Sequence, residues 1–94
     1  MENLVVGQEV TLNRDMMKEV AGAKGYVYEV YDDFDNPSES AVSIIFQNGS
    51  YDGFSRQEQL LFISAGRVDQ RYCMYEFKNV NELLKNYKNG YWKF

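Results

Sequence analysis

The chain has 94 residues, a net charge of −4 and 45% apolar residues, which is the composition of one globular domain. Its single cysteine, Cys73, excludes an internal disulfide, and no apolar run approaches the roughly 18 residues that a membrane span needs. The N-terminus has neither the basic nor the apolar region of a signal peptide. We therefore expect one cytoplasmic domain that covers residues 1–94.

The first half of the chain predicts β-strands separated by turn signals. Four stretches are rich in strand-forming residues: 5–12, 26–31, 41–47 and 50–54. Val10 and Leu12 share one face of the first stretch. In the second stretch, Val27 and Val30 both point inward only if a bulge separates them. Residues 13–25 lie between these two strands, and we expect them to form a long, partly packed loop.

The third stretch alternates between an apolar and a smaller or polar side, and Ile45 is the exception to this pattern. Asn48 and Gly49 follow it directly. Both central residues of a type I′ turn adopt positive φ, which asparagine and glycine tolerate best. The sequence therefore predicts a tight hairpin that returns as the fourth strand.

After this hairpin, the pattern changes to short helical and strand segments. Ser55 and Glu58 have the spacing of a capping box, which predicts a single helical turn over 55–59. The apolar residues of 60–64 predict another strand. Alternate residues of 71–77 (a cysteine, a tyrosine and a phenylalanine) predict an additional strand that faces inward with these three side chains.

A C-terminal helix is predicted by its start, its periodicity and its end. Asn79 and Glu82 form a pair similar to a capping box. Apolar residues then recur at helical spacing as far as Tyr87, and Asn89 and Gly90 supply the stop. The opposite side of this helix carries its charged residues, so we expect that side to face water.

This order of elements resembles that of a small SH3-like barrel. Residues 22–30 resemble the glycine-then-valine pattern at the second strand of KOW- and Tudor-type barrels, and residues 51–55 resemble the passage from the fourth strand into the single turn. The resemblance implies a mainly β fold, with a five-stranded SH3-like barrel in 1–65 and an added strand and one α-helix in 66–94. Such barrels are frequent among short bacterial and phage-encoded proteins, which implies an accessory protein of that origin. The Ala-Leu-Tyr-Asp-Tyr box and the tryptophan pair of proline-peptide-binding SH3 domains are absent.

Residue types that support catalysis or metal binding are sparse. The chain has no histidine, so Cys73 has no imidazole to activate it, and no phosphate-binding loop or zinc spacing occurs. Asp32, Asp33 and Asp35 are close together, but a solvated loop offers no burial to raise the pKa of a carboxyl. No glycine or closing glutamate completes a calcium loop around them. We expect no catalytic residue, no metal and no cofactor.

The leading functional hypothesis is a non-catalytic protein-interaction module with an acidic and aromatic surface. Residues 29–58 contain seven acids and one base. The SH3-like resemblance implies that the loops of this region converge into a site for a basic partner. The residues of the predicted surface are Tyr31, Asp33, Phe34, Asp35, Tyr51, Asp52 and Phe54. Alternatively, Tyr51 and Phe54 fill the end of the barrel, and Phe34 either folds back onto the core or stays exposed.

The alternative hypothesis places function at the basic end, because residues 59–94 contain three acids and six bases. Aromatic rings beside basic side chains stack on single-stranded nucleic acid and neutralise phosphates. The residues of this second surface are Arg71, Lys85, Lys88 and Trp92. A chain end of this composition also docks onto its own core or onto a second copy, which would make the protein a homodimer. No membrane partner is expected.

Overall fold

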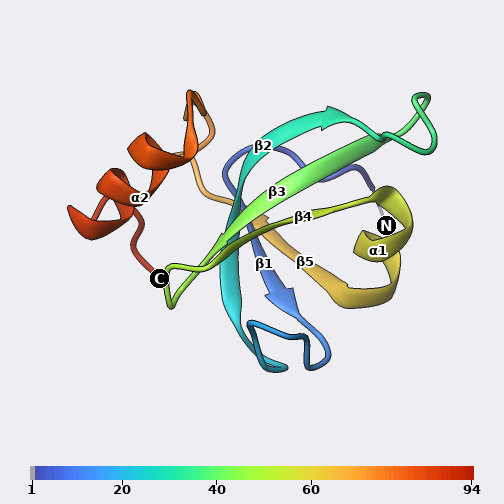
Figure 1. The fold of residues 1–94 in the computed structure, drawn as a ribbon, viewed down its shortest axis with the longest axis horizontal. Helices are drawn as coiled ribbons and strands as arrows, with labels where there is room; N and C mark the ends of the chain where they lie inside the picture. The colour runs from blue at the N-terminus through green and yellow to red at the C-terminus, as the bar shows by residue number, and fades with distance from the viewer. Residues whose placement is uncertain (1) are drawn as a thin grey trace.

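The computed structural model describes residues 2–94, in which five strands and two helices are found. In chain order these elements are β1 (Gln8–Leu12), β2 (Lys24–Asp32), β3 (Ser40–Phe46), β4 (Tyr51–Phe54), α1 (Arg56–Phe62), β5 (Ile63–Val68) and α2 (Val80–Lys88). The strands form one antiparallel sheet in the order β4-β3-β2-β1-β5 (Figure 1). This confirms the mainly β fold with a C-terminal helix.

The sheet is strongly bent but remains open. Its edge strands, β4 and β5, form no ladder with each other within residues 2–94, and α1 connects them at one end. The closed barrel that the sequence resemblance implies is therefore not formed by strand pairing. No helix in the described part of the chain has the length and apolar character needed to cross a membrane.

The inner face of the sheet carries the first hydrophobic core. Its buried residues are Leu4, Val10, Leu12, Val27, Val42, Ile44, Phe46, Phe54 and Ile63. β2 contains a bulge, because its pairing with β3 shifts between Val27 and Glu29. This meets the condition under which Val27 and Val30 both point inward. Val27 then lies opposite Ile44 and Val30 opposite Val42, so both valines share the inner face.

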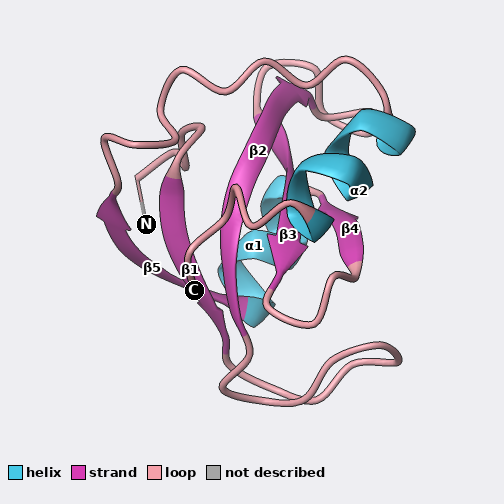
Figure 2. Cartoon of the chain, turned by 90° about the vertical axis from the view of Figure 1, so that its left-hand side faces the viewer, coloured by secondary structure: helices cyan, strands magenta, loops and turns pink. Residues whose placement is uncertain are grey.

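The outer face carries a second core, which explains the exceptional Ile45. This residue is fully buried, because the C-terminal segment covers the outer face of β2 and β3. The buried members of this cluster are Tyr26, Tyr28, Ile45, Tyr72, Leu83 and Trp92. Figure 2 shows α2 in front of β3 and β4, on this outer face. The sheet is therefore covered on both faces at β2 and β3, and β3 reads as a nearly continuous apolar run.

Two of the predicted strands are wrong in whole or in part. The predicted strand over 60–64 is replaced by the end of α1, and β5 begins only at Ile63. The capping box between Ser55 and Glu58 is confirmed, but the helix continues to Phe62. The reason is Gln59, which is buried and donates from Nε2 to the carbonyls of Ser40 (3.0 Å) and Phe54 (3.1 Å). These bonds anchor the second turn of the helix.

The additional strand predicted over 71–77 does not form. Its first residues make turns, in which the Tyr72 N–H donates to Asp69 and the Tyr75 N–H donates to Tyr72. Tyr75 and Phe77 pack against the second core, whereas Cys73 is half-buried. These aromatic side chains are buried against the outer face of the sheet without their backbone pairing with a strand. Alternation of apolar residues is therefore not sufficient to identify a strand here.

The hairpin after β3 forms with a different turn from the predicted type I′. Gly49 has a φ of +91°, but within the described residues only glycines have positive φ, so Asn48 does not. The Gly49 N–H donates to the Phe46 carbonyl, and the Phe46 N–H donates to Ser50 (2.8 Å). This is the pattern of a three-residue loop with a glycine bulge. The long loop between β1 and β2 is confirmed over 13–23.

Candidate functional site

The turn between β2 and β3, residues 32–39, is held in a defined shape; we call it the Phe34 loop. Asp33 donates from its N–H to the Glu39 carbonyl (2.9 Å), and Glu39 donates back to Asn36 (2.9 Å). Ser38 Oγ donates to the Asn36 side chain (2.8 Å). These hydrogen bonds join residues of the loop to one another, so they restrict the conformations available to its tip.

Asp33 fastens this loop to the rest of the domain. Its side chain is only 5% exposed: Oδ2 accepts the N–H of Arg56 (2.8 Å) and Oδ1 accepts that of Asp35 (2.9 Å). Arg56 is the first residue of α1, so the carboxylate accepts from one of the first N–H groups of the helix, which have no acceptor within the helix itself. The hydrogen bond from Arg56 lowers the pKa of Asp33. Asp33 therefore has a structural role inside the predicted surface.

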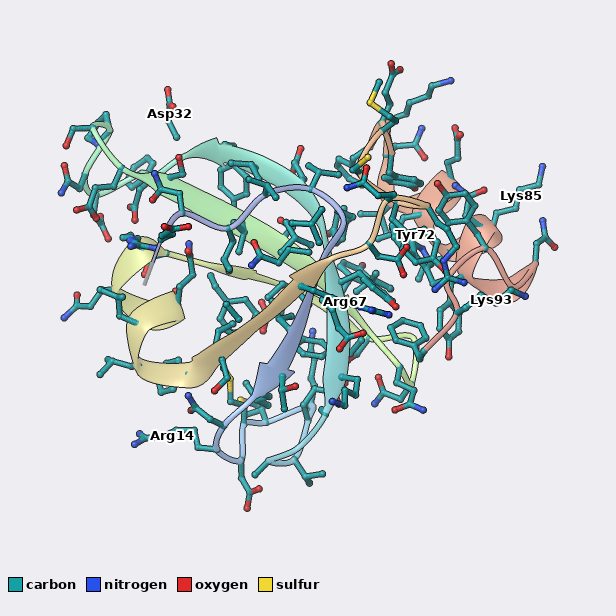
Figure 3. All side chains as sticks on the ribbon, turned by 180° about the vertical axis from the view of Figure 1, so that it is seen from behind. Arg14, Asp32, Arg67, Tyr72, Lys85 and Lys93 are labelled. Carbon is teal, nitrogen blue, oxygen red and sulfur yellow. The ribbon has the colours of Figure 1, made fainter. Side chains whose placement is uncertain are left out.

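Phe34, the next residue, has the opposite environment. Its side chain is 96% exposed, so the alternative in which it folds back onto the core is wrong. The carboxylates of Asp32, Asp35 and Glu39 are exposed around the same turn. Figure 3 shows Asp32 at one extremity of the molecule, away from the core. The Phe34 loop thus presents one aromatic ring among carboxylates on a fixed turn.

Of the remaining residues of the predicted acidic and aromatic surface, Tyr31 and Asp52 are exposed, whereas Tyr51 and Phe54 pack against the two cores. Phe54 is 1% exposed and belongs to the first core, as the alternative interpretation expects. Tyr51 is half-buried against the second core. Tyr31 is 41% exposed near the end of β2, and a Cβ added to Gly53 of β4 would come within 2.8 Å of its hydroxyl. Asp52 is exposed on β4, toward the opposite end of this strand from the Phe34 loop.

The aromatic part of the basic end is docked onto the core. Trp92 is 4% exposed and lies against Tyr26, Tyr72 and Tyr75, with ring centroids 4.9–5.9 Å apart. The tail is held by two hydrogen bonds, from the Tyr26 hydroxyl to the Lys93 carbonyl (3.0 Å) and from the Lys93 N–H to the Tyr72 hydroxyl (2.7 Å). The indole ring is therefore not available to stack on a nucleotide base.

The basic side chains of this end do not gather around Trp92. Arg71 pairs with Asp69 (2.7 Å) and lies over the Tyr72 ring, 5.0 Å from its centroid. The hydrogen bond from Arg71 lowers the pKa of Asp69 to about 2. Lys85 and Lys88 are exposed on α2, and Figure 3 shows Lys85 and Lys93 on the same side of the molecule as Tyr72. Of the second predicted surface, Arg71, Lys85 and Lys88 are exposed, whereas its one aromatic member, Trp92, is buried.

Sequence reasoning missed a cavity of about 180 Å³ between the long loop and β4. Buried Leu12, Phe46 and Phe54 line it from the core, and Met16 lines it from the loop. Its other lining residues are Met17, Lys18, Glu19, Ser50 and Asp52. The signal in the sequence was the pair of adjacent methionines in the long loop.

No protein-family model matches this chain, and searches of curated proteins and of solved structures find no match either. Within residues 2–94, no three His, Cys, Asp or Glu side chains lie close enough together to hold a metal ion.

Proposed function

We propose that this protein is a non-catalytic protein-interaction module that binds a basic protein partner through the Phe34 loop. The observation that carries the proposal is the 96% exposure of Phe34 on a turn that Asp33 fastens to α1. A phenylalanine in water forgoes the burial of a large apolar ring, worth about 1.5–3 kcal/mol. Complex formation supplies that burial.

The fixed shape of the loop favours binding. A partner that contacts a preformed turn orders few additional residues, so less of the interaction energy is lost to conformational entropy. Aromatic residues, phenylalanine included, are enriched at the cores of protein–protein interfaces. The Phe34 loop therefore combines an anchor with a low entropic cost.

The charge around Phe34 supports a basic partner. Asp32, Asp35 and Glu39 are exposed beside it, and residues 29–58 carry a net charge of −6 from seven acids and one base. Carboxylates around an apolar anchor steer a basic surface toward it and repel an acidic one. We expect the partner to present an apolar pocket bordered by Lys or Arg.

The scaffold that we propose for this loop is an SH3-like sheet. Two features support this scaffold: the strand order β4-β3-β2-β1-β5 and the helix between β4 and β5. The same succession of strands and helix along the chain gave the resemblance in the sequence. We further propose a cytoplasmic location, since the chain has one cysteine and Cys73 is a free thiol. The SH3-like resemblance supports an accessory protein of bacterial or phage origin.

The test is quantitative affinity capture from a nuclease-treated bacterial lysate with four immobilised variants. These are the natural protein, Phe34→Ala, Asp35→Lys and the control Met74→Ala, whose methionine is 85% exposed elsewhere on the surface. A partner that docks on the Phe34 loop should be captured by the natural protein and the control. Phe34→Ala should weaken capture by about tenfold or more, as truncation of an interface anchor does.

Charge gives the second arm of this experiment. Capture should fall with added salt and fall further with Asp35→Lys, because both weaken the attraction of carboxylates for a basic surface. Partners held equally by all four variants would contradict the proposal. A signal that a parallel untreated lysate gives and the nuclease-treated lysate does not would transfer the function to the exposed lysines of α2.

A further inference from the structure

The cavity beneath the long loop is built as a receptor for one side chain. Its interior is apolar, with Leu12, Phe46 and Phe54 each at most 1% exposed behind it. Its volume of about 180 Å³ is comparable to the roughly 150 Å³ of an engineered apolar cavity that binds benzene. A ring or a branched aliphatic side chain therefore fits, and water gains few hydrogen bonds there.

The long loop holds this cavity open. Within the loop, the Met16 N–H donates to the Glu19 carbonyl (2.7 Å), which fixes the turn that carries both methionines. Ser50 Oγ donates to the Glu19 carboxylate, and Lys18 Nζ lies 6.0 Å from the centroid of the Tyr51 ring. The loop is thus tied to the start of β4 at two places.

Met17 stands fully exposed beside the cavity, although its neighbour Met16 is partly buried against the first core. A methionine side chain is flexible and polarizable, and it adapts to the shape of a bound group. An exposed methionine at the opening of an apolar cavity enlarges the surface that an entering side chain buries.

The rim of the cavity carries two carboxylates and one ammonium group, from Asp52, Glu19 and Lys18. Glu19 is engaged by Ser50, and Lys18 lies over Tyr51. Asp52 is exposed, and within residues 2–94 its carboxylate forms no ion pair; Oδ1 accepts only the adjacent Gly53 N–H (2.8 Å). A cation that approaches the rim therefore has one carboxylate to pair with.

We propose that this cavity binds one large apolar side chain of a partner peptide that carries Lys or Arg directly beside it. The apolar group fills the cavity, and the basic group pairs with Asp52. This site lies at the opposite end of the sheet from the Phe34 loop, as the positions of the two turns in Figure 1 show. Its occupation requires no contact with that loop.

The test is a titration with three short peptides, observed through the methionine methyl groups by NMR. The peptides are acetyl-Lys-Leu-Lys-amide, acetyl-Lys-Ala-Lys-amide and acetyl-Glu-Leu-Glu-amide. The Lys-Leu-Lys peptide should shift the methyl signals of Met16 and Met17 saturably and leave that of Met74 unchanged, because Met74 lies in a turn outside the cavity. The Ala peptide should produce no saturable shift, and the Glu peptide should bind several-fold more weakly.

Asp52→Asn supplies the variant, because an asparagine Oδ1 still accepts the Gly53 N–H while the charge is removed. It should abolish the preference for the Lys peptide over the Glu peptide. A preference that survives Asp52→Asn, equal shifts at Met74, or no saturable shift at Met16 and Met17 would each overturn the proposal. The titration involves no captured protein, so its failure would leave the proposal for the Phe34 loop standing.

Discussion

At the scale of single residues, Asp33 and Phe34 are adjacent in the chain and have opposite environments. The carboxylate is 5% exposed because it binds the N–H of Arg56, which is 23 positions away, whereas the ring is 96% exposed. Both belonged to one predicted surface, since a loop rich in aspartate indicates charge without showing which carboxylate is engaged. Which carboxylate is engaged depends on the contact between the loop and α1. These two segments are distant in the sequence, so no local pattern predicts the contact.

Asp33→Asn should lower the melting temperature by a few degrees near neutral pH, because an amide cannot accept two N–H groups as a carboxylate does. The pKa of Asp33 is lowered in the folded state by its bond from Arg56. Its stabilisation is therefore complete above the unfolded pKa of about 3.9 and is lost as the pH falls through the folded value. Melting curves at several pH values check this.

The same charge change at exposed Asp35, as Asp35→Asn, supplies the control. It should leave the melting temperature nearly unchanged at every pH. If Asp33→Asn and the natural protein differed equally at neutral and strongly acidic pH, the effect of Asp33 would not come from its charge.

At the scale of elements, local signals located the starts of helices better than their ends. Ser55 and Asn79 were identified as caps, and both accept the N–H three residues on, from Glu58 and Glu82. The end of α1 was missed because Gln59 has a polar side chain and yet is buried. Its Nε2 donates to one carbonyl of β3 and one of β4, which no local pattern shows. Similarly, Ile45 departs from the alternation of β3 because the C-terminal segment buries it on the outer face.

Gln59→Leu should lower the free energy of unfolding by about 1–3 kcal/mol, although leucine is the more apolar residue. The substitution leaves the buried carbonyls of Ser40 and Phe54 without the donor that Gln59 Nε2 provides. Urea unfolding followed by circular dichroism measures the change. Gln57→Leu, at an exposed position of the same helix, should change stability little; equal effects of the two substitutions would disprove the role of these bonds.

At the scale of the whole molecule, the sheet is stabilised by a core on each face. The inner core was largely predictable, since Val10 and Leu12 and the apolar side of β3 follow a period of two. The outer core was not, because its residues come from 26–28, 45 and 72–92, and no strand or helix pattern links these segments. The aromatic excess of the sequence is largely accounted for by this outer core.

Trp92→Ala should reduce the free energy of unfolding by about 3–5 kcal/mol, the usual cost of truncating a buried aromatic ring. Its ring is 4% exposed and contacts several tyrosines, whereas Phe94 is 40% exposed. Phe94→Ala should therefore cost clearly less in the same urea experiment. A stable Trp92→Ala variant that had lost affinity for single-stranded nucleic acid would contradict the structural role assigned to this ring.

The outer core should also limit stability at alkaline pH. Burial raises the pKa of Tyr28 to about 12, and it also raises the pKa of Tyr26, Tyr75 and Tyr91. Since these folded values exceed the unfolded value of about 10, the stabilisation is complete below that pH and is lost as the pH rises toward 12. Tyrosinate absorbance and circular dichroism should therefore change together. Ionisation of all eight tyrosines near pH 10 without unfolding would contradict the account.

The most direct measurement for the central claim is site-specific photo-crosslinking from the tip of the Phe34 loop. A photoreactive phenylalanine analogue is placed at position 34 and, as a control, at position 74, which is similarly exposed on another part of the surface. We predict a discrete protein adduct from position 34 that is absent from position 74 and weakens when Asp35→Lys is added. Adducts from position 74 alone, or from neither position while the partner is still captured, would show that binding occurs elsewhere and that Phe34 is not the anchor.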